Sequence, residues 1–237
     1  MKIKGSIAFV TGASRGLGLA FAKEALSRGS AKVYAGMRDP TGFNESGIVP
    51  VRIDVTDPES VVAAAAVASD VTLLVNNAGI AGRVESPLAA DMDLVSRQLF
   101  ETNYFGIIRV TQAFQSRLPD GGRGAILNVL SDATWRPNLI LAAYAASKAA
   151  AWSYTNHLRL QLLDRKIQVL GLHVGFVDTD LTKRLNVPKS SPAEVVKQTF
   201  DALEAGKNEI MADAGTRALK ESLSAENPGY ITPDLSN

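Results

Sequence analysis

The stretch TGASRGLG, Thr11–Gly18, follows an apolar segment, 6–11, and precedes an amphipathic segment, 17–28. An apolar run, then glycines, then a helical pattern predicts a strand, a tight turn and a helix. The glycines at 12, 16 and 18 permit a tight turn and close backbone approach to a pyrophosphate. The free N–H groups and positive dipole end of the following helix favour an anion there. The stretch therefore predicts a phosphate-binding turn.

The rest of the chain repeats this alternation of apolar runs and longer amphipathic segments. Strands are predicted at 6–11, 31–36, 49–54, 71–76, 124–130, 167–174 and 209–212, and helices at 17–28, 57–68, 91–118, 143–164 and 192–205. Asp57 is the expected N-cap of the second helix, with Pro58 at its first position. Strands alternating with helices predict an α/β fold with a doubly wound parallel sheet, in three layers. The length of 237 residues is usual for a single domain, 1–237.

Composition excludes several classes of protein. The formal net charge is +1 and like charges do not cluster, so no nucleic-acid partner is expected. The chain has no cysteine and two histidines outside any metal-binding motif, so no metal site is expected. The first apolar run, 7–10, is far shorter than a signal segment or a membrane span, which predicts a cytoplasmic protein without a membrane partner.

A second motif places a phenol and an ammonium one helical turn apart. Tyr144 and Lys148 are spaced i, i+4 in a predicted helix, and Ser131 follows a predicted strand upstream. Reduction of a ketone develops negative charge on its oxygen, so the site needs a proton donor and a second hydrogen-bond donor. A nearby ammonium should lower the pKa of a phenol, which is about 10 when unperturbed. These three residues are the expected catalytic groups.

The end of the second predicted strand bears on the choice of dinucleotide. A site for NAD usually has a carboxylate there to accept the ribose 2′-hydroxyl. The expected position is Met37, and Arg38 follows it. Arg38 and Arg15, within the glycine turn, could both bind a 2′-phosphate, which favours NADP(H). A strand end one residue later would instead bring Asp39 to the ribose.

Together these motifs resemble the short-chain dehydrogenase/reductase family, and the resemblance extends from Thr11 to about Thr179. It implies a Rossmann-type domain, a nicotinamide cofactor and reversible reduction of a carbonyl to an alcohol. The cofactor-binding residues that it implies or that the motifs predict are Gly12, Ser14, Arg15, Gly16, Leu17, Gly18, Arg38, Asp54, Val55, Asn77, Ala78, Gly79, Tyr144, Lys148, Val177 and Thr179.

The resemblance also implies individual roles. Asp54 would lie near the adenine, Asn77-Ala78-Gly79 beside the adenosine ribose and the cofactor backbone, and Thr179 near the carboxamide. Tyr144 would be the general acid in reduction, Ser131 would bind the substrate oxygen, and Lys148 would bind the nicotinamide ribose. Asn103 would hold a water that continues the proton path, which completes a catalytic set of Asn103, Ser131, Tyr144 and Lys148.

Three features depart from the family pattern. Val174-Gly175 replaces the frequent Pro-Gly, the segment between the second and third strands is short, and the glycine-rich ending is missing. A substrate loop is expected around 178–192 and a loose tail after 224. The substrate, a small-molecule carbonyl or alcohol, would meet an apolar wall of Trp135, Leu139, Phe176, Leu181 and Leu185. A homodimer or a homotetramer is expected.

Two other functions remain open from the sequence. The chain could bind NADP(H) as a sensor without useful turnover. Gly12 to Gly16 also matches G-x-S-x-G, the nucleophile turn of serine hydrolases, with Ser14 as nucleophile. Asp54 or Asp164 and then His173 could supply the acid and base in that order. That interpretation leaves Gly18, Tyr144 and Lys148 without a role.

Overall fold

The computed structural model describes residues 1–231, and its centre is a seven-stranded parallel sheet of order β3-β2-β1-β4-β5-β6-β7. The strands are β1 (Ile7–Thr11), β2 (Lys32–Met37), β3 (Ile48–Arg52), β4 (Leu73–Asn76), β5 (Ala125–Val129), β6 (Gln168–His173) and β7 (Glu209–Met211). The strand order reverses between β1 and β4, and ligands of open α/β sheets bind at such a switch point, beyond the carboxyl ends of the strands. The predicted fold class is confirmed.

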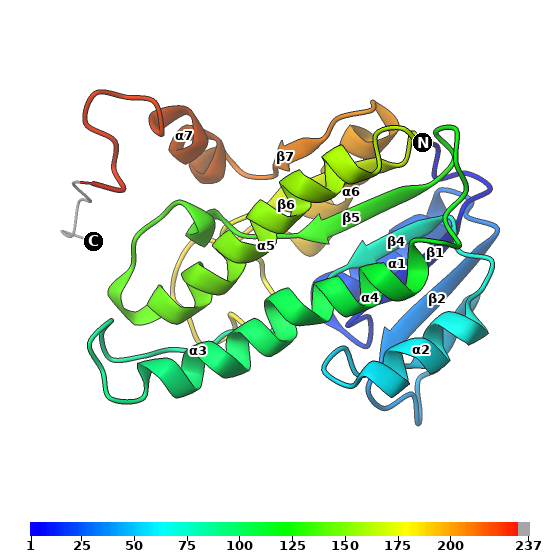
Figure 1. Ribbon diagram of the computed structural model, residues 1–237, viewed down its shortest axis with the longest axis horizontal. Coiled ribbons are helices and arrows are strands. Elements are labelled where there is room, and N and C mark those ends of the chain that lie inside the picture. The colour runs from blue at the N-terminus through cyan, green and yellow to red at the C-terminus, as the bar shows by residue number, and fades with distance from the viewer. Residues whose placement is uncertain (232–237) are drawn as a thin grey trace.

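Helices cover both faces of this sheet, which gives the three predicted layers (Figure 1). The helices are α1 (Gly16–Ser27), α2 (Pro58–Val67), α3 (Met92–Phe100), α4 (Gly106–Phe114), α5 (Ala142–Gln161), α6 (Pro192–Glu204) and α7 (Ala214–Ser222). One core packs α1 and α6 against the sheet through Phe21 and Phe200, whose ring centroids are 5.5 Å apart. The other packs α2, α4 and α5 against the opposite face, with Phe114 and Leu158 among its buried side chains.

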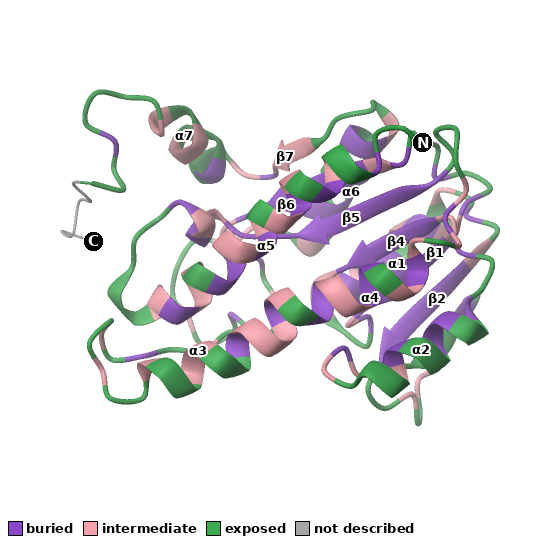
Figure 2. Ribbon diagram, viewed as in Figure 1, coloured by how far each residue is buried: buried purple, intermediate pink, exposed green. Residues whose placement is uncertain are grey.

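The inner strands β1, β2, β4, β5 and β6 are buried on both sides, as Figure 2 shows for the centre of the sheet. This burial explains their near-continuous runs of Val, Leu, Ile and Ala, because a parallel strand between two helical layers has no face in contact with solvent. The cap of α2 is as predicted: the Asp57 side chain accepts a hydrogen bond from the Glu59 N–H, and Pro58 begins the helix.

Two elements differ from the sequence-based expectation. The single helix predicted at 91–118 is divided by a π-helical turn, η1 (Glu101–Phe105), between α3 and α4. The helix α7 was not predicted; its N-cap is Asp213, whose side chain accepts a hydrogen bond from the Thr216 N–H. Residues 232–237 of the expected tail lie outside the described residues.

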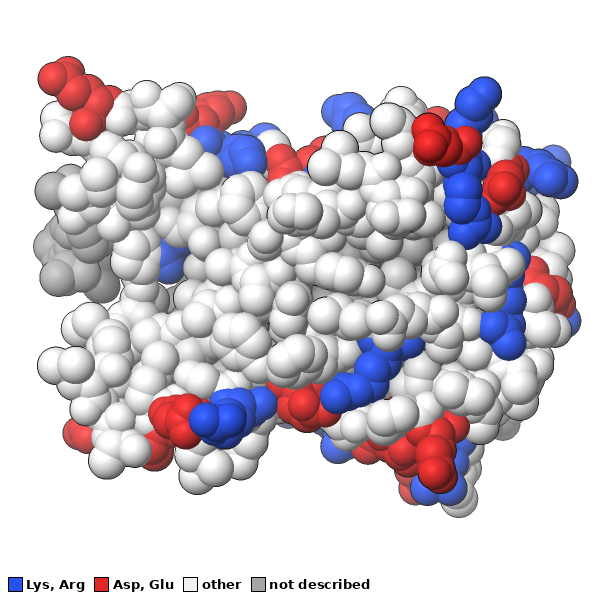
Figure 3. All heavy atoms as spheres, viewed as in Figure 1, with Lys and Arg blue, Asp and Glu red and all other residues white. Residues whose placement is uncertain are grey.

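Charge is distributed unevenly over the face that α3, α4 and α5 form. Figure 3 shows that the centre of this face carries few charged side chains, while lysine, arginine and acidic residues lie towards its margins. Among residues 1–231, no helix combines the length and the apolar character that a membrane span requires.

Candidate active site

The glycine turn between β1 and α1 has the backbone geometry that its sequence predicts. Gly12 and Gly16 have φ of +66° and +57°, in the left-handed region that favours glycine. A Cβ on Gly18 would lie 2.2 Å from the Gly12 carbonyl oxygen, so a side chain there is excluded. The turn therefore brings bare backbone to the N-terminus of α1, and this cradle fits the pyrophosphate of a dinucleotide.

The turn after β4 holds this cradle from the side. Asn77 donates from Nδ2 to the carbonyls of Thr11 (2.9 Å) and Gly12 (3.2 Å). The Thr11 hydroxyl in turn accepts from the N–H groups of Asn77 and Ala78, each at 3.0 Å. Since each turn supplies the hydrogen bonds of the other, the two segments form one rigid floor at the switch point.

The strand β2 ends at Met37, so Arg38 is the first residue beyond it and is exposed. Asp39 is exposed as well, and its carboxylate accepts a hydrogen bond from the Thr41 N–H at 2.9 Å, which lowers the pKa of Asp39. Arg15, in the glycine turn, forms an exposed ion pair at 3.4 Å with Asp180. Asp54 follows β3 and accepts two hydrogen bonds from Thr56, which lower its pKa.

Tyr144 and Lys148 lie in the first half of α5, and Ser131 follows β5. The Lys148 side chain is 4% exposed, and its Nζ donates to the Val129 carbonyl at 2.9 Å and lies 5.9 Å from the centre of the Tyr144 ring. The Ser131 hydroxyl accepts from the Ala133 N–H at 3.2 Å and donates to Asp132 at 3.3 Å. The structure therefore gathers the phenol, the ammonium and the hydroxyl at the carboxyl end of β5.

Burial governs the protonation of both groups on α5. It lowers the pKa of Lys148 to about 8. It raises the pKa of Tyr144 to about 12, although the hydrogen bond with Ser131 acts in the opposite direction. The expectation that Lys148 lowers the pKa of Tyr144 is wrong for this structure, because removal of the phenol from water has the larger effect.

Asn103 lies at the centre of the π-helical turn and is fully buried. Its Nδ2 donates to the Ile80 carbonyl (3.0 Å) and to Ser147 Oγ (3.1 Å), while its Oδ1 accepts from the Ile80 N–H (2.9 Å). A Cβ on Gly79 would come within 3.3 Å of this Oδ1 and 3.7 Å of Lys148 Nζ. Asn103 thus ties the segment after β4 to α5, beside the lysine; its role in holding a water stays a prediction.

The segment after β6 comes close to the glycine turn. The side chain of Thr179 lies 3.4 Å from where a Cβ of Gly16 would stand. Val177 is buried and forms an isolated parallel bridge with Ser190, which closes the base of the expected substrate loop. The Gly175 N–H donates to the Asp213 carboxylate at 2.9 Å, so the turn in which Val174 replaces proline is anchored to the cap of α7.

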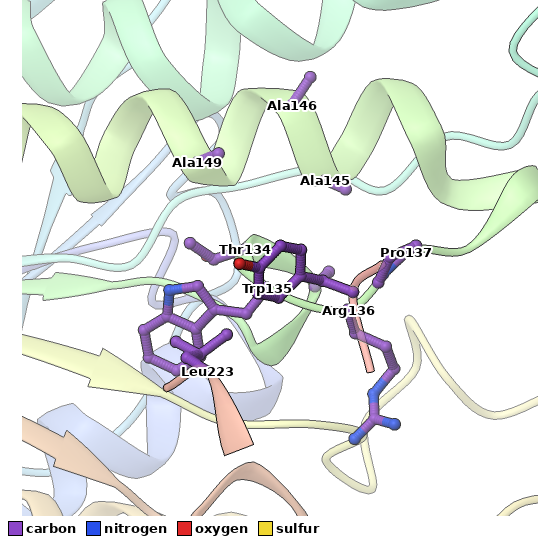
Figure 4. A pocket seen from close by; sticks show the side chains of 10 residues that line it. Thr134, Trp135, Arg136, Pro137, Ala145, Ala146, Ala149 and Leu223 are labelled. Carbon is purple, nitrogen blue, oxygen red and sulfur yellow. The ribbon is translucent and has the colours of Figure 1, made fainter. Parts of the chain in front are cut away.

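An open pocket of about 480 Å³ lies between the segment after β5, helix α5 and the C-terminal segment (Figure 4). In Figure 4, Ala145 and Ala149 lie on the side of α5 that faces Thr134 and Trp135. Of the five predicted wall residues, Trp135 lines this pocket and the others lie outside it. Three of these others, Leu139, Phe176 and Leu181, are exposed apolar side chains, and Leu185 is partly exposed.

A serine hydrolase would need a general base beside Ser14. Ser14 is exposed at the tip of the glycine turn. Of the two histidines, His173 is buried against Ser131, and His157 bonds the Ser153 carbonyl on the exposed side of α5. Within residues 1–231, neither histidine forms a hydrogen bond with Ser14, so no Ser-His pair is present there.

Comparison with known proteins decides the family. The family model described as short chain dehydrogenase matches residues 6–190. The chain belongs to the short-chain dehydrogenase family. It is therefore an oxidoreductase whose family binds a nicotinamide cofactor and interconverts carbonyls and alcohols.

Several short-chain dehydrogenases are similar over most of their length. A 3-oxoacyl-(acyl-carrier-protein) reductase of Vibrio cholerae is 34% identical over 78% of this chain and 79% of its own. A 1-deoxy-11-beta-hydroxypentalenate dehydrogenase of Streptomyces avermitilis is 30% identical over 90% and 84%. The crystal structure of a short chain dehydrogenase from Burkholderia cenocepacia in complex with NADP is 38% identical, with a TM-score of 0.89 and 95% of each chain covered.

Two residues of this short-chain dehydrogenase site were not predicted as part of it. Ser147 lies inside the Tyr144-to-Lys148 motif and joins Asn103 to the Tyr144 carbonyl, to which it donates at 2.7 Å. The Thr11 hydroxyl links the two turns under the cradle. Both residues lie within or beside a motif quoted above, so their position in the sequence could have indicated a role in the site. Their hydrogen-bond partners could not be inferred from the sequence.

Proposed function

We propose that this short-chain dehydrogenase reduces a ketone or aldehyde to an alcohol with NADPH, and that the reaction is reversible. The observation that carries the proposal is the gathering of Ser131, Tyr144 and Lys148 beside a glycine cradle at one end of the sheet. When bound, the nicotinamide would supply the hydride.

Two residues of the chain would bind and protonate the carbonyl oxygen of the substrate. The Ser131 hydroxyl would donate a hydrogen bond to that oxygen, and the Tyr144 hydroxyl would give it a proton as negative charge develops. A phenol whose pKa is raised to about 12 holds its proton at neutral pH, which suits an acid. Lys148 would bind the nicotinamide ribose, whose hydroxyls would accept hydrogen bonds from its buried ammonium and so favour the charged form.

The preference for NADP(H) rests on the end of β2. Met37 offers no acceptor for a 2′-hydroxyl, Arg38 is the next residue, and Asp39 is engaged in its own turn with Thr41. Arg38 with Arg15 would bind the 2′-phosphate. The similar structure from Burkholderia cenocepacia holds NADP, which supports this assignment, whereas a less similar one from Burkholderia phymatum, 23% identical, holds NAD.

Exposed apolar side chains and a weakly charged helical face support the proposed substrate class and oligomeric state. The exposed apolar side chains Leu139, Phe176 and Leu181 favour an apolar or aromatic carbonyl. The weakly charged centre of the face that α3, α4 and α5 form would support association into a homodimer or homotetramer. Cytoplasmic location stays a prediction.

The mechanism is tested by following NADPH and NADH consumption with a panel of aliphatic, aryl and cyclic carbonyls. We expect consumption with NADPH to exceed that with NADH. Tyr144→Phe should lose nearly all turnover yet still bind NADPH in a fluorescence titration, because the variant loses the proton donor but keeps the glycine cradle. Retention of most turnover would refute the assignment of Tyr144. Tight NADPH binding without turnover on any carbonyl would favour the sensor function.

The cofactor preference is tested separately with Arg38→Asp. A carboxylate at this position repels a 2′-phosphate and accepts a 2′-hydroxyl, so the ratio of kcat/KM for NADPH to that for NADH should fall well below the unmodified enzyme's. The matched control is Arg123→Asp, an exposed arginine just before the amino end of β5, away from the carboxyl ends of the strands, which should leave the ratio unchanged. An unchanged ratio in Arg38→Asp would contradict the assignment.

A further inference from the structure

A buried polar cluster lies behind Ser131, on the last strands of the sheet. Its centre is His173, the final residue of β6, whose side chain is 0% exposed. The imidazole stacks on the Trp135 indole with ring centroids 4.0 Å apart and an interplanar angle of 22°. No step of the proposed reaction uses this histidine, so its burial calls for a separate explanation.

One side of the ring is joined to the serine of the active site. His173 Nδ1 lies 3.1 Å from the Ser131 carbonyl oxygen. A carbonyl can only accept, so Nδ1 must carry the proton and donate it. The same carbonyl also accepts from the Thr134 N–H at 3.3 Å, within the turn Asp132–Thr134 that follows Ser131. The imidazole therefore holds this turn from the side of β6.

The other side of the ring faces a carboxylate. His173 Nε2 lies 3.2 Å from Glu209 Oε1, so the carboxylate faces this nitrogen directly. The His173 ring holds the pKa of Glu209 at about 2, with help from Lys220, whose Nζ lies 3.2 Å from Oε2. Trp152 of α5 donates from its indole N–H to Glu209 Oε1, also at 3.2 Å. Glu209 is thus an ionised group that β7, α5 and α7 hold against the imidazole.

The position of the ammonium completes the cluster. Lys220 Nζ lies 4.3 Å from the centroid of the Trp135 ring, which also stacks on the imidazole and packs edge-on against Trp152. Trp135 follows directly on the turn Asp132–Thr134. Every member of the cluster therefore contacts the segment after Ser131 or contacts a residue that does.

We propose that His173, oriented by Glu209, is a positioning residue that fixes the turn after β5 and so keeps the Ser131 hydroxyl aimed at the substrate oxygen. This inference rests on the role of Ser131 in the proposed function. The hydrogen bond is the reason for a histidine here. An aliphatic side chain would fill the same space, but the Ser131 carbonyl would lose the hydrogen bond that it accepts from Nδ1. A small displacement of a group that binds the reacting oxygen is costly to turnover.

Two substitutions separate the contributions of the two ring nitrogens. His173→Asn keeps a donor close to the place of Nδ1, whereas His173→Gln keeps one close to the place of Nε2 and loses the bond to Ser131. We expect His173→Gln to lower kcat by about 10- to 100-fold, with the affinity for NADPH unchanged, since the cofactor cradle is not touched. His173→Asn should recover most of kcat. The control is His157→Gln, on the exposed side of α5, which should behave as the unmodified enzyme.

A double-mutant cycle with Ser131→Ala tests whether His173 acts through that hydroxyl. If it does, adding His173→Gln to Ser131→Ala produces no further fall in kcat, because the group being positioned is already gone. Independent, additive losses would overturn the inference, as would equal kcat for His173→Gln and His173→Asn. Should Ser131→Ala alone keep full turnover, the proposed function itself would fail, which is a distinct result.

Thermal melting of each variant distinguishes loss of position from loss of fold. If His173→Gln melts below the assay temperature, Glu209→Gln takes its place in the same cycle, since Glu209 lies at the partly exposed end of the cluster. Its expected effect is a smaller fall in kcat that again disappears in the Ser131→Ala background. A fall of the same factor in both backgrounds would overturn the inference.

Discussion

Replacement of Lys148 by methionine should remove activity and make the cofactor-free protein more stable at neutral pH. The lysine is almost completely buried, and burial lowers its pKa from 10.5 to about 8. The folded chain therefore releases this proton above about pH 8, while the unfolded chain keeps it up to about pH 10.5. Holding the ammonium inside the fold costs about 3 kcal/mol at pH 7.

Methionine is unbranched like lysine, is one heavy atom shorter and carries no charge. It also leaves the Val129 carbonyl without the donor that lies 2.9 Å away, a loss of about 1 kcal/mol. The net gain at pH 7 is thus about 2 kcal/mol, or roughly 4–8 °C in Tm for a domain of this size. The gain should disappear by about pH 9.5, because the folded chain has by then released the proton and the cost is roughly 1 kcal/mol.

The assay is chemical denaturation of the cofactor-free protein at pH 7 and pH 9.5, with the exposed Lys207→Met as control. The raised pKa of Tyr144 also makes stability depend on pH, but this residue is common to both proteins and drops out of the difference. A Lys148→Met protein no more stable than the unmodified one at pH 7 would refute the reasoning. A gain of the same size at both pH values would also refute it, since the cause would then be packing and not charge.

Two further predictions concern the groups that frame the site. Asn103→Ala should destabilise the protein by about 2–3 kcal/mol, because it leaves both backbone groups of Ile80 without their side-chain partner; denaturation against the exposed Gln112→Ala on α4 checks this, and equal stability would contradict it. Gly18→Ala should cost about 1–3 kcal/mol and weaken NADPH binding, since its Cβ would lie 2.2 Å from the Gly12 oxygen. Gly229→Ala is the control, because a Cβ there meets nothing within 4 Å, and its affinity for NADPH should be unchanged. Equal affinity in the two variants would contradict the binding of NADPH at the glycine turn.

The features that the sequence predicted well depend on residues close together in the chain. The glycine turn needs only local backbone freedom, and its positive φ values at Gly12 and Gly16 follow from the residue type. The cap at Asp57 is likewise a bond across two residues. The parallel sheet followed from the alternation of apolar runs with helical patterns, because strands between two helical layers have no polar face.

The features that it missed depend on partners far away in the chain. Periodicity predicted one helix at 91–118, yet Asn103 turns into the protein to reach Ile80 and Ser147, and the helix takes a π-helical turn there. A hydrophobic pattern records the side that faces the core, and it does not record a bond to a residue 23 positions earlier. The pKa of Tyr144 was misjudged for a similar reason, since the i, i+4 spacing shows the lysine but not the extent of burial.

By itself, the sequence determined the fold class and the glycine turn, and it supplied the candidate catalytic groups, because each of these depends on local backbone geometry or on residue chemistry. Tertiary structure alone decided which groups hold them in place. His173, Ser131 and Glu209 come from three separate parts of the chain, and they meet only because the carboxyl end of β6 lies beside that of β5 and β7 pairs with β6. The direction of a hydrogen bond depends on where packing puts its two atoms, and no spacing along the chain records that position.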